Sequence, residues 1–223
     1  MSSSTPIPSA TVVLLRDTPE GLKVLLLHRN SEIAYAGSWV FPGGRIDAHE
    51  FLKAGDDALQ AAKLAAVRET AEEAGIEVTE PELVFLSHWT TPIIRPKRFS
   101  TWFFLAPATA EDVQVDGGEI HAFEWHSPAT ALQARREGRI ELQPPTFVTL
   151  TLLQPFTTVA EAMAHFAAQP PAKIEPKVVK TADAVVYLYN GDAGHMEGNP
   201  ELPGSRHRLL QRPDGDWQYL HEI

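Results

Sequence analysis

The pattern of apolar and polar residues predicts a mixed α/β fold. Short apolar runs bounded by turn residues predict strands, and they lie at residues 10–15, 22–28, 82–88, 100–105 and 119–125. The turn residues Asp17 to Gly21 join the first two runs into a β-hairpin. A segment rich in Ala, Leu, Glu and Arg predicts a long helix over 56–74, which Gly75 ends.

The second half of the chain is predicted to be helical first and β-rich afterwards. Helices are expected at 128–137 with Ser127 as N-cap, at 147–153, and at 158–168 with a capping box at Thr158. Strands are expected at 184–189, 206–210 and 217–220. We therefore expect a flexible N-terminus (1–9), a main domain (10–140), and a C-terminal extension (141–223) packed on the same body.

Composition narrows the function. The 223 residues include 29 Asp and Glu against 19 Lys and Arg, a formal net charge of −10, which argues against stable nucleic-acid binding. Cysteine is absent, so disulfides, thiolate metal sites and cysteine nucleophiles are excluded. The N-terminus has no secretory pattern and the sequence has no apolar run of membrane-spanning length, so we expect a cytoplasmic protein without a membrane partner.

The predicted helix over 56–74 carries the clearest chemical signal. At about 100° per residue, Glu69, Glu72 and Glu73 share one face about 100° wide. The opposite face is predicted to be the apolar one, with Leu64, Val67, Ala71 and Ala74. Clustered carboxylates repel one another, and Mg²⁺, which prefers oxygen ligands, would relieve that repulsion. The alternative is a solvated acidic surface with Arg68 as a partner.

Residues upstream of this helix favour the metal site. The sequence Phe41-Pro42-Gly43-Gly44 precedes it, and the whole region resembles the Nudix hydrolases, whose box is G-x5-E-x7-R-E-U-x-E-E-x-G-U with U aliphatic. Gly44 and Glu50 match the first half of the box. The second half is matched by Arg68, Glu69, Glu72, Glu73, Gly75 and Ile76, with Thr70 at the first U position.

The spacing between the two halves departs from the family pattern. Seventeen residues separate Glu50 from Arg68 where the pattern has seven, so ten residues within 51–60 interrupt the box. The residue eight positions before Arg68 is Gln60, which is not acidic, and the role of Glu50 is left open. Interrupted boxes resemble a subgroup related to the coenzyme A diphosphatases, as does the proline-rich stretch 143–146. The coenzyme A signature is partly present in 25–29 and Gly37, but its second Arg is missing near Ala34.

The resemblance implies a fold and a set of site residues. It implies a Nudix-type α/β/α sandwich with a mixed sheet, to which this chain adds the helical and β-rich extension. The implied metal ligands are Gly43, Glu69, Glu72, Glu73 and Glu119, with Mg²⁺ as cofactor and Mn²⁺ as substitute. The resemblance also implies the catalytic residues, with Glu69 or Glu119 as general base. They are Arg68, Glu69, Glu72, Glu73 and Glu119. The expected substrate-binding residues are Gly43, Gly44, Arg29, Arg45 and Arg95.

We therefore interpret the chain as a Mg²⁺-dependent pyrophosphohydrolase acting on a nucleoside diphosphate derivative, with coenzyme A or an acyl-CoA as a candidate. One alternative is a non-catalytic nucleotide sensor on the same fold, and another is an acidic structural domain. Other side chains have simpler interpretations: Arg95, Lys97 and Arg98 fit a solvated basic turn as well as a phosphate contact, and the aromatic and histidine residues fit core or surface positions. A homodimer is the default expectation for a soluble enzyme.

Overall fold

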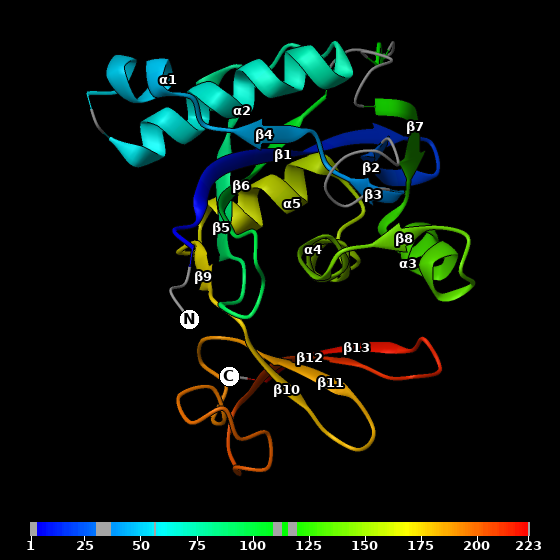
Figure 1. The fold of residues 1–223 in the computed structure, drawn as a ribbon. Coiled ribbons are helices and arrows are strands. Elements are labelled where there is room, and N and C mark those ends of the chain that lie inside the picture. Colours follow the sequence, from blue (N-terminus) through cyan, green and yellow to red (C-terminus); the bar gives the residue numbers. More distant parts are fainter. Residues whose placement is uncertain (1–3, 30–36, 56, 109–112, 116–119, 223) are drawn as a thin grey trace.

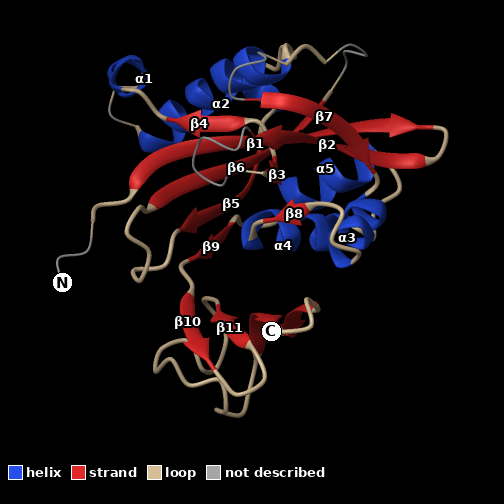
Figure 2. Ribbon diagram, turned by 45° about the vertical axis from the view of Figure 1, so that its right-hand side comes forward, coloured by secondary structure: helices blue, strands red, loops and turns tan. Residues whose placement is uncertain are grey.

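The computed structural model of the protein describes residues 4–29, 37–55, 57–108, 113–115 and 120–222. It contains two β-sheets, and helices cover both faces of the larger one (Figure 1). The smaller sheet forms a separate layer beside that sandwich, as Figure 2 shows from a second direction. The predicted α/β/α sandwich with a C-terminal β-rich extension is therefore confirmed.

The larger sheet is mixed. Within the described residues its strands are β1 (Ile7–Thr18), β2 (Gly21–Arg29), β3 (Ser38–Val40), β4 (Gly43–Arg45), β5 (Val84–Thr90), β6 (Phe99–Pro107), β7 (Ile120–His126), β8 (Glu141–Leu142) and β9 (Ala172–Ile174). The order is β8-β3-β2-β1-β6-β5-β9, with β4 also paired to β1 and β7 to β2. Strand β1 is antiparallel to β2 and β4 and parallel to β6, so it forms the centre of the sheet.

The helices divide between the two faces of this sheet. They are α1 (Ala48–Lys53), α2 (Ala58–Ala74), the short 3-10 helix η1 (Glu80–Glu82), α3 (Pro128–Arg136), α4 (Pro144–Leu153) and α5 (Val159–Ala167). Helices α1 and α2 lie on one face, and α3, α4 and α5 lie on the other (Figure 1). Each face therefore needs its own set of apolar side chains.

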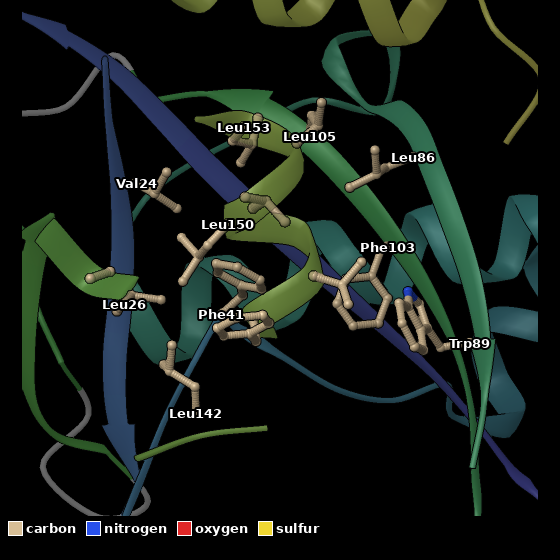
Figure 3. Close-up of a cluster of buried hydrophobic side chains, with 14 of the residues drawn as sticks. Val24, Leu26, Phe41, Leu86, Trp89, Phe103, Leu105, Leu142, Leu150 and Leu153 are labelled. Carbon is tan, nitrogen blue, oxygen red and sulfur yellow. The ribbon is translucent and has the colours of Figure 1, made fainter. Parts of the chain in front are cut away.

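The period-2 alternation of β1 supplies both sets. Val12 and Leu14 belong to the core beneath α2, whereas Val13 and Leu15 belong to the core beneath α4 and α5. Figure 3 shows the second core, in which Leu150 of α4 packs among apolar side chains of the sheet. All four β1 side chains are fully buried, which explains why this stretch is almost continuously apolar.

Helix α2 corrects one prediction about its faces. The buried face is formed mainly by small residues at Ala61, Ala62, Ala65, Ala66, Thr70, Glu73 and Ala74. Ala71, predicted to lie on the apolar face, is exposed, and Glu73 is buried. The prediction was therefore wrong for Ala71, and Glu73 is more buried than expected, whereas Glu72 is exposed and all three carboxylates line a cavity. Alanine lets the helix lie close to the sheet, so the face that begins with alanines ends with Glu69 and Glu73 against β4.

The smaller sheet consists of β10 (Lys177–Lys180), β11 (Val185–Leu188), β12 (Arg206–Gln211) and β13 (Trp217–Glu222), all antiparallel and in that order. Aromatic side chains join it to the sandwich. Tyr189 lies 5.4 Å from Trp89 and Trp217 lies 5.2 Å from Phe147, measured between ring centroids. The second core is therefore continuous with the smaller sheet.

Local sequence signals located most elements to within a few residues. Ser127 caps α3, Thr158 and Glu161 form the predicted capping box of α5, and Gly75 ends α2 in a left-handed conformation. Helix α4 begins at Pro144 rather than 147, because proline is tolerated in the first turn of a helix. The short elements α1, β3, β4, η1, β8, β9 and β10 were not predicted. Among the described residues, no helix is both long and apolar enough to cross a membrane.

Candidate active site

Two glycines bring β4 into direct contact with β1 and α2. A Cβ atom on Gly43 would overlap the backbone of Ala10 and Thr11, and one on Gly44 would overlap the carboxylate of Glu69. Thr11 fixes the preceding bend by donating a hydrogen bond of 2.6 Å to the Pro42 carbonyl. The diglycine sequence is therefore required by close packing, and it places the backbone beside the carboxylates of α2.

Arg68 is the centre of the carboxylate cluster. Its Nη1 donates to Glu69 Oε1 at 2.8 Å and to Glu72 Oε2 at 3.0 Å, while its Nη2 lies 3.9 Å from Asp47. Its Nε donates to Glu50 Oε1 at 2.9 Å. Burial alone would lower the pKa of Arg68, but the hydrogen bonds that it donates to Glu50 and Glu69 outweigh this effect and raise the pKa above its usual value. The guanidinium therefore stays charged and faces four carboxylates.

Glu50 belongs to this cluster despite the interrupted box. Its side chain is almost fully buried, and its Oε2 accepts a hydrogen bond of 2.8 Å from the Asp47 amide in a capping box of α1. Of the ten extra residues, those at 51–55 form the end of α1 and a turn, and those at 57–60 include Asp57, which caps α2, and the start of that helix. Gln60 bonds to Glu80 instead. The extra residues therefore do not prevent Glu50 from binding the side chain of Arg68.

Glu73 and Thr70 fill the buried side of the helix. Glu73 is 6% exposed, and its Oε2 accepts a hydrogen bond of 2.8 Å from the Gly43 amide. Thr70 is fully buried where the family pattern has an aliphatic residue, and its hydroxyl donates to the Ala66 carbonyl at 2.8 Å. The polar substitution at this position is thus satisfied within the helix.

The donor set fits a hard divalent cation. Glu69, Glu72 and Glu73 line one cavity together with Gly43, and all four offer oxygen ligands of the kind Mg²⁺ and Mn²⁺ prefer. Within the described residues, no group of three acidic or histidine side chains is already arranged around a common point. Arg68 binds Glu69 and Glu72 through the same nitrogen, so these carboxylates would exchange that contact for a metal ion.

The cavity beside this cluster has a volume of about 1150 Å³. Its carboxylate end is formed by α2 and β4. Its other walls come from the β5–β6 loop, the N-terminus of α4 and the C-terminal segment, with Thr91, Pro92, Arg95, Lys97, Gln143, Pro144, Pro145, Thr146, Pro176 and Tyr187 among the lining residues. The cavity is therefore shared between the sandwich and the extension.

Most of the predicted site residues line this cavity. They are Gly43, Gly44, Glu69, Glu72, Glu73, Arg29, Arg45 and Arg95. Arg68 lies behind the acids and binds the Arg45 carbonyl through Nη2 at 3.0 Å. Glu119, the predicted fourth acid, lies outside the described residues, so its predicted role stays a prediction.

The three basic residues of the β5–β6 loop have different environments. Arg98 is buried and holds the loop, since its Nε donates to the Thr91 carbonyl at 3.0 Å and its Nη2 lies 3.5 Å from Glu175. Arg95 and Lys97 are exposed and line the cavity. Asp192, His195 and His207, in the C-terminal region, lie outside both described cavities.

Sequence reasoning missed several lining residues. Trp89 and Tyr187 contribute aromatic surface from β5 and β11, and Glu141 contributes a carboxylate from β8. None belongs to a motif, because their convergence depends on how the C-terminal sheet packs on the sandwich. The proline-rich stretch 143–146 was noticed in the sequence, and it forms part of the wall.

Comparison with known proteins agrees with this geometry. A family model described as the NUDIX domain matches residues 5–146. The chain is 28% identical over 132 residues to the acyl-coenzyme A diphosphatase NUDT19 of Xenopus laevis, covering 56% of this chain and 34% of that protein. It is 30% identical over 122 residues to the human protein of the same name, covering 52% and 32%. The chain thus matches about a third of the length of these relatives.

Solved structures share the fold. A NUDIX hydrolase from Alicyclobacillus acidocaldarius superposes with a TM-score of 0.67 at 22% identity, covering 76% of this chain and all of that chain. The NUDIX domain of Shewanella oneidensis NrtR, in complex with ADP ribose, gives a TM-score of 0.50 at 22% identity, covering 68% and 86%. At these identities the likeness establishes the fold alone.

Proposed function

The chain belongs to the Nudix family, and from that premise we propose that it is a divalent-metal-dependent pyrophosphohydrolase that cleaves a phosphoanhydride bond in a nucleoside diphosphate derivative. The observation that carries the proposal is the charge imbalance around Arg68. One guanidinium contacts the carboxylates of Asp47, Glu50, Glu69 and Glu72. Such an excess of negative charge at the wall of a cavity favours cation binding.

The residues that would hold Mg²⁺ or Mn²⁺ are Glu69, Glu72 and Glu73, with the Gly43 carbonyl. A divalent ion bound there would neutralise the diphosphate and lower the pKa of a bound water. The chain itself supplies positioning: Arg68 orients Glu69 and Glu72, and the Gly43 amide orients Glu73. The absence of a side chain on Gly44 leaves Glu69 room beside the backbone. Glu69 is the proposed proton acceptor, with Glu119 as the alternative.

Coenzyme A or an acyl-CoA is the proposed substrate. The curated relatives are acyl-coenzyme A diphosphatases, and the cavity of about 1150 Å³ is large enough for an extended ligand. The aromatic and proline side chains of its walls suit the apolar parts of such a molecule. A nucleotide-sensing role, the alternative from a different class, is less well supported because every carboxylate of the second half of the box is present.

A substrate panel tests this function. Coenzyme A, an acyl-CoA, ADP-ribose, NADH and dinucleoside polyphosphates are each incubated with Mg²⁺ or Mn²⁺, and the release of phosphate-bearing products is measured. We expect turnover of the coenzyme A compounds, and we expect Glu72→Gln to lower kcat by roughly 10²-fold or more, the scale of losing a positioned charged group.

Glu77→Gln is the matched control. Glu77 is exposed, lies just beyond α2 and does not line the described cavities, and its substitution makes the same change of charge. Its kcat should equal that of the wild type. Equal turnover by Glu72→Gln and the wild type would remove the carboxylate cluster from the reaction, and ligand binding without any turnover would favour the sensor.

A further inference from the structure

A second hollow adjoins the large cavity and differs from it in charge. Its volume is about 640 Å³, and it shares Arg95, Glu141, Gln143, Pro144 and Tyr187 with the large cavity. Three acids of the large cavity, Glu69, Glu72 and Glu73, come from α2, on one face of the sheet. The walls of this small cavity come from α3, β8, the start of α4 and the smaller sheet, which lie toward the other side of the molecule (Figure 1).

The small cavity is basic. Among its described lining residues are three arginines, Arg95, Arg135 and Arg139, and a single carboxylate, that of Glu141. In a protein with a formal net charge of −10, such a local excess of arginine is an exception that needs an explanation. Arginine presents a planar fork of donors that matches the oxygens of a phosphate group.

Two of these arginines are partly occupied. The guanidinium of Arg135 lies 3.8 Å from the ring centroid of Trp217 and donates to the Gly215 carbonyl. Arg139 donates to Glu137 through Nε at 2.7 Å and pairs with it through Nη2 at 2.6 Å. These contacts fix both side chains in place. They leave Arg139 largely neutralised and Arg135 charged.

Arg95 is the cation available to a ligand. Across the described part of the chain its side chain makes no hydrogen bond or ion pair, and it lines both cavities where they meet. Its loop is nevertheless held in place, because the Arg95 amide donates to the Pro92 carbonyl at 3.0 Å and the buried Arg98 anchors the base of the loop. An unpaired arginine on an anchored loop is well placed to bind an anion.

We propose that Arg95, supported by Arg135, binds a phosphate monoester of the substrate that is separate from the diphosphate at the carboxylate cluster. The inference rests on the proposed function and deepens it, because it names the substrate class as nucleoside diphosphate derivatives with an additional terminal phosphate. The large cavity takes the diphosphate beside α2, and the small cavity takes the second phosphate. Arg95 is thus a residue that determines specificity, without contact with the reacting bond.

The test compares two substrates that differ by one phosphate. Coenzyme A and 3′-dephospho-coenzyme A are assayed with the full-length protein in Mg²⁺, and the ratio of their kcat/KM values is the readout. We expect the wild type to favour coenzyme A at least about tenfold, because only coenzyme A can make the charge-assisted contact with Arg95. Arg95→Gln should lower that ratio toward one through the KM of coenzyme A, and Arg95→Lys should retain part of it.

Arg136→Gln is the matched control. Arg136 is exposed on the same helix as Arg135, makes only a 3.8 Å ion pair with Asp216, and lies outside both described cavities. It should leave the ratio unchanged. Glu141→Gln, which removes the carboxylate of the small cavity, should raise the ratio. A wild type without preference, or an Arg95→Gln variant that loses the same factor for both substrates, would overturn the proposal.

Equilibrium binding separates this proposal from the proposed function. If neither compound is hydrolysed, the proposed function fails for them, and isothermal titration of each compound still measures the phosphate preference and its dependence on Arg95. Absence of binding by both compounds would overturn the phosphate site as well. Inorganic phosphate is the third ligand: if it binds and its binding is lost in Arg95→Gln while coenzyme A shows no preference, the site takes free phosphate and the substrate-binding role is wrong.

Discussion

Arg68 and Arg208 are both arginines that bind carboxylates, but they do so in opposite ways. Arg208 and Asp192, in the C-terminal region, form a buried pair with contacts of 2.7 Å from Nε to Oδ2 and from Nη2 to Oδ1. The remaining capacity of Asp192 is used by the amides of Gly194 and His207. Arg68, in contrast, is shared among four carboxylates at the wall of a cavity.

The difference separates a structural ion pair from a binding site. Burial alone would raise the pKa of Asp192, but the hydrogen bonds from Arg208 and the two amides lower it, so the pair is balanced and closed to further ligands. Around Arg68 the negative charges exceed the positive one, and Glu72 remains largely exposed. Excess negative charge with access to solvent favours a bound cation, and a cation held there would offset the repulsion of an anionic substrate. Each cluster can therefore be changed while the other is left intact.

The largest expected effect is on catalysis, from Glu69→Gln. The substitution removes a proposed metal ligand and base, so we expect kcat to fall by roughly 10²–10⁴-fold. The amide oxygen can still accept from Arg68, and one of the repelling charges is lost, so the melting temperature should stay the same or rise. Steady-state kinetics and thermal melting of the same preparation measure both. A loss of activity that follows a loss of folding would contradict the functional interpretation of this cluster.

Asp192→Asn should produce the opposite result. It leaves Arg208, whose side chain is 7% exposed, without its balancing charge, and breaking a buried ion pair costs about 3–5 kcal/mol. We expect a large fall in the free energy of unfolding, measured by urea denaturation, with normal kcat for the folded fraction. Asp214→Asn, in the exposed β12–β13 turn, is the control and should change stability little. Wild-type stability in Asp192→Asn would mean that the pair does not hold the C-terminal region.

Divalent cations should stabilise the carboxylate cluster around Arg68 and not the Arg208–Asp192 ion pair. Saturating Mg²⁺ or Mn²⁺ should raise the melting temperature, by the equivalent of about 2.7 kcal/mol at a hundredfold excess over Kd. The shift should be lost in Glu69→Gln and retained in Asp192→Asn, whose melting begins from a lower temperature. The same shift in all three proteins would place the bound ions elsewhere on this acidic surface.

The comparison also shows what sequence reasoning can reach. Local signals are encoded by neighbours in the chain, so the caps of α3 and α5 and the end of α2 followed from a few residues each. The spacing of Glu69, Glu72 and Glu73 on one turn likewise needed only helical geometry. The position of Glu50 could not be predicted in this way, because the number of intervening residues does not determine which side chain it contacts. Its bond to Arg68 joins residues 18 positions apart.

The environment of each face was harder to predict than the element itself. The periodicity of α2 did not reveal that alanines would form its buried side, since alanine is nearly neutral in such patterns and the sheet decides which face is covered. The balance at Asp192, in the loop after β11, depends on Arg208, 16 positions away on β12. Interactions between segments far apart in the chain could therefore not be predicted from the sequence. They include the interactions that distinguish the Arg208–Asp192 pair from the candidate site.

The smallest expected effect concerns pH and the smaller sheet. His207 lies with Nδ1 2.7 Å from the Asn190 carbonyl and Nε2 3.0 Å from the Tyr219 hydroxyl, so its neutral form donates to one and accepts from the other. Burial lowers its pKa, the nearby ring of His221 lowers it further, and the bond to Asn190 together with Asp192 opposes the shift in part. The unfolded chain therefore takes up a proton at a higher pH than the folded chain.

The sign follows from this difference. The stabilising contribution of His207 is fully present above the unfolded pKa of about 6.5 and is lost as the pH falls from there toward the lower folded pKa. Melting temperatures measured between pH 7.5 and 5 should decline below 6.5, and His207→Gln should flatten that part of the curve. His121→Gln, an exposed residue of β7, should leave the slope unchanged. An identical slope in His207→Gln would assign the acid sensitivity to other groups, and His88 and His221, whose pKa values are also lowered by burial, would then be the first to test.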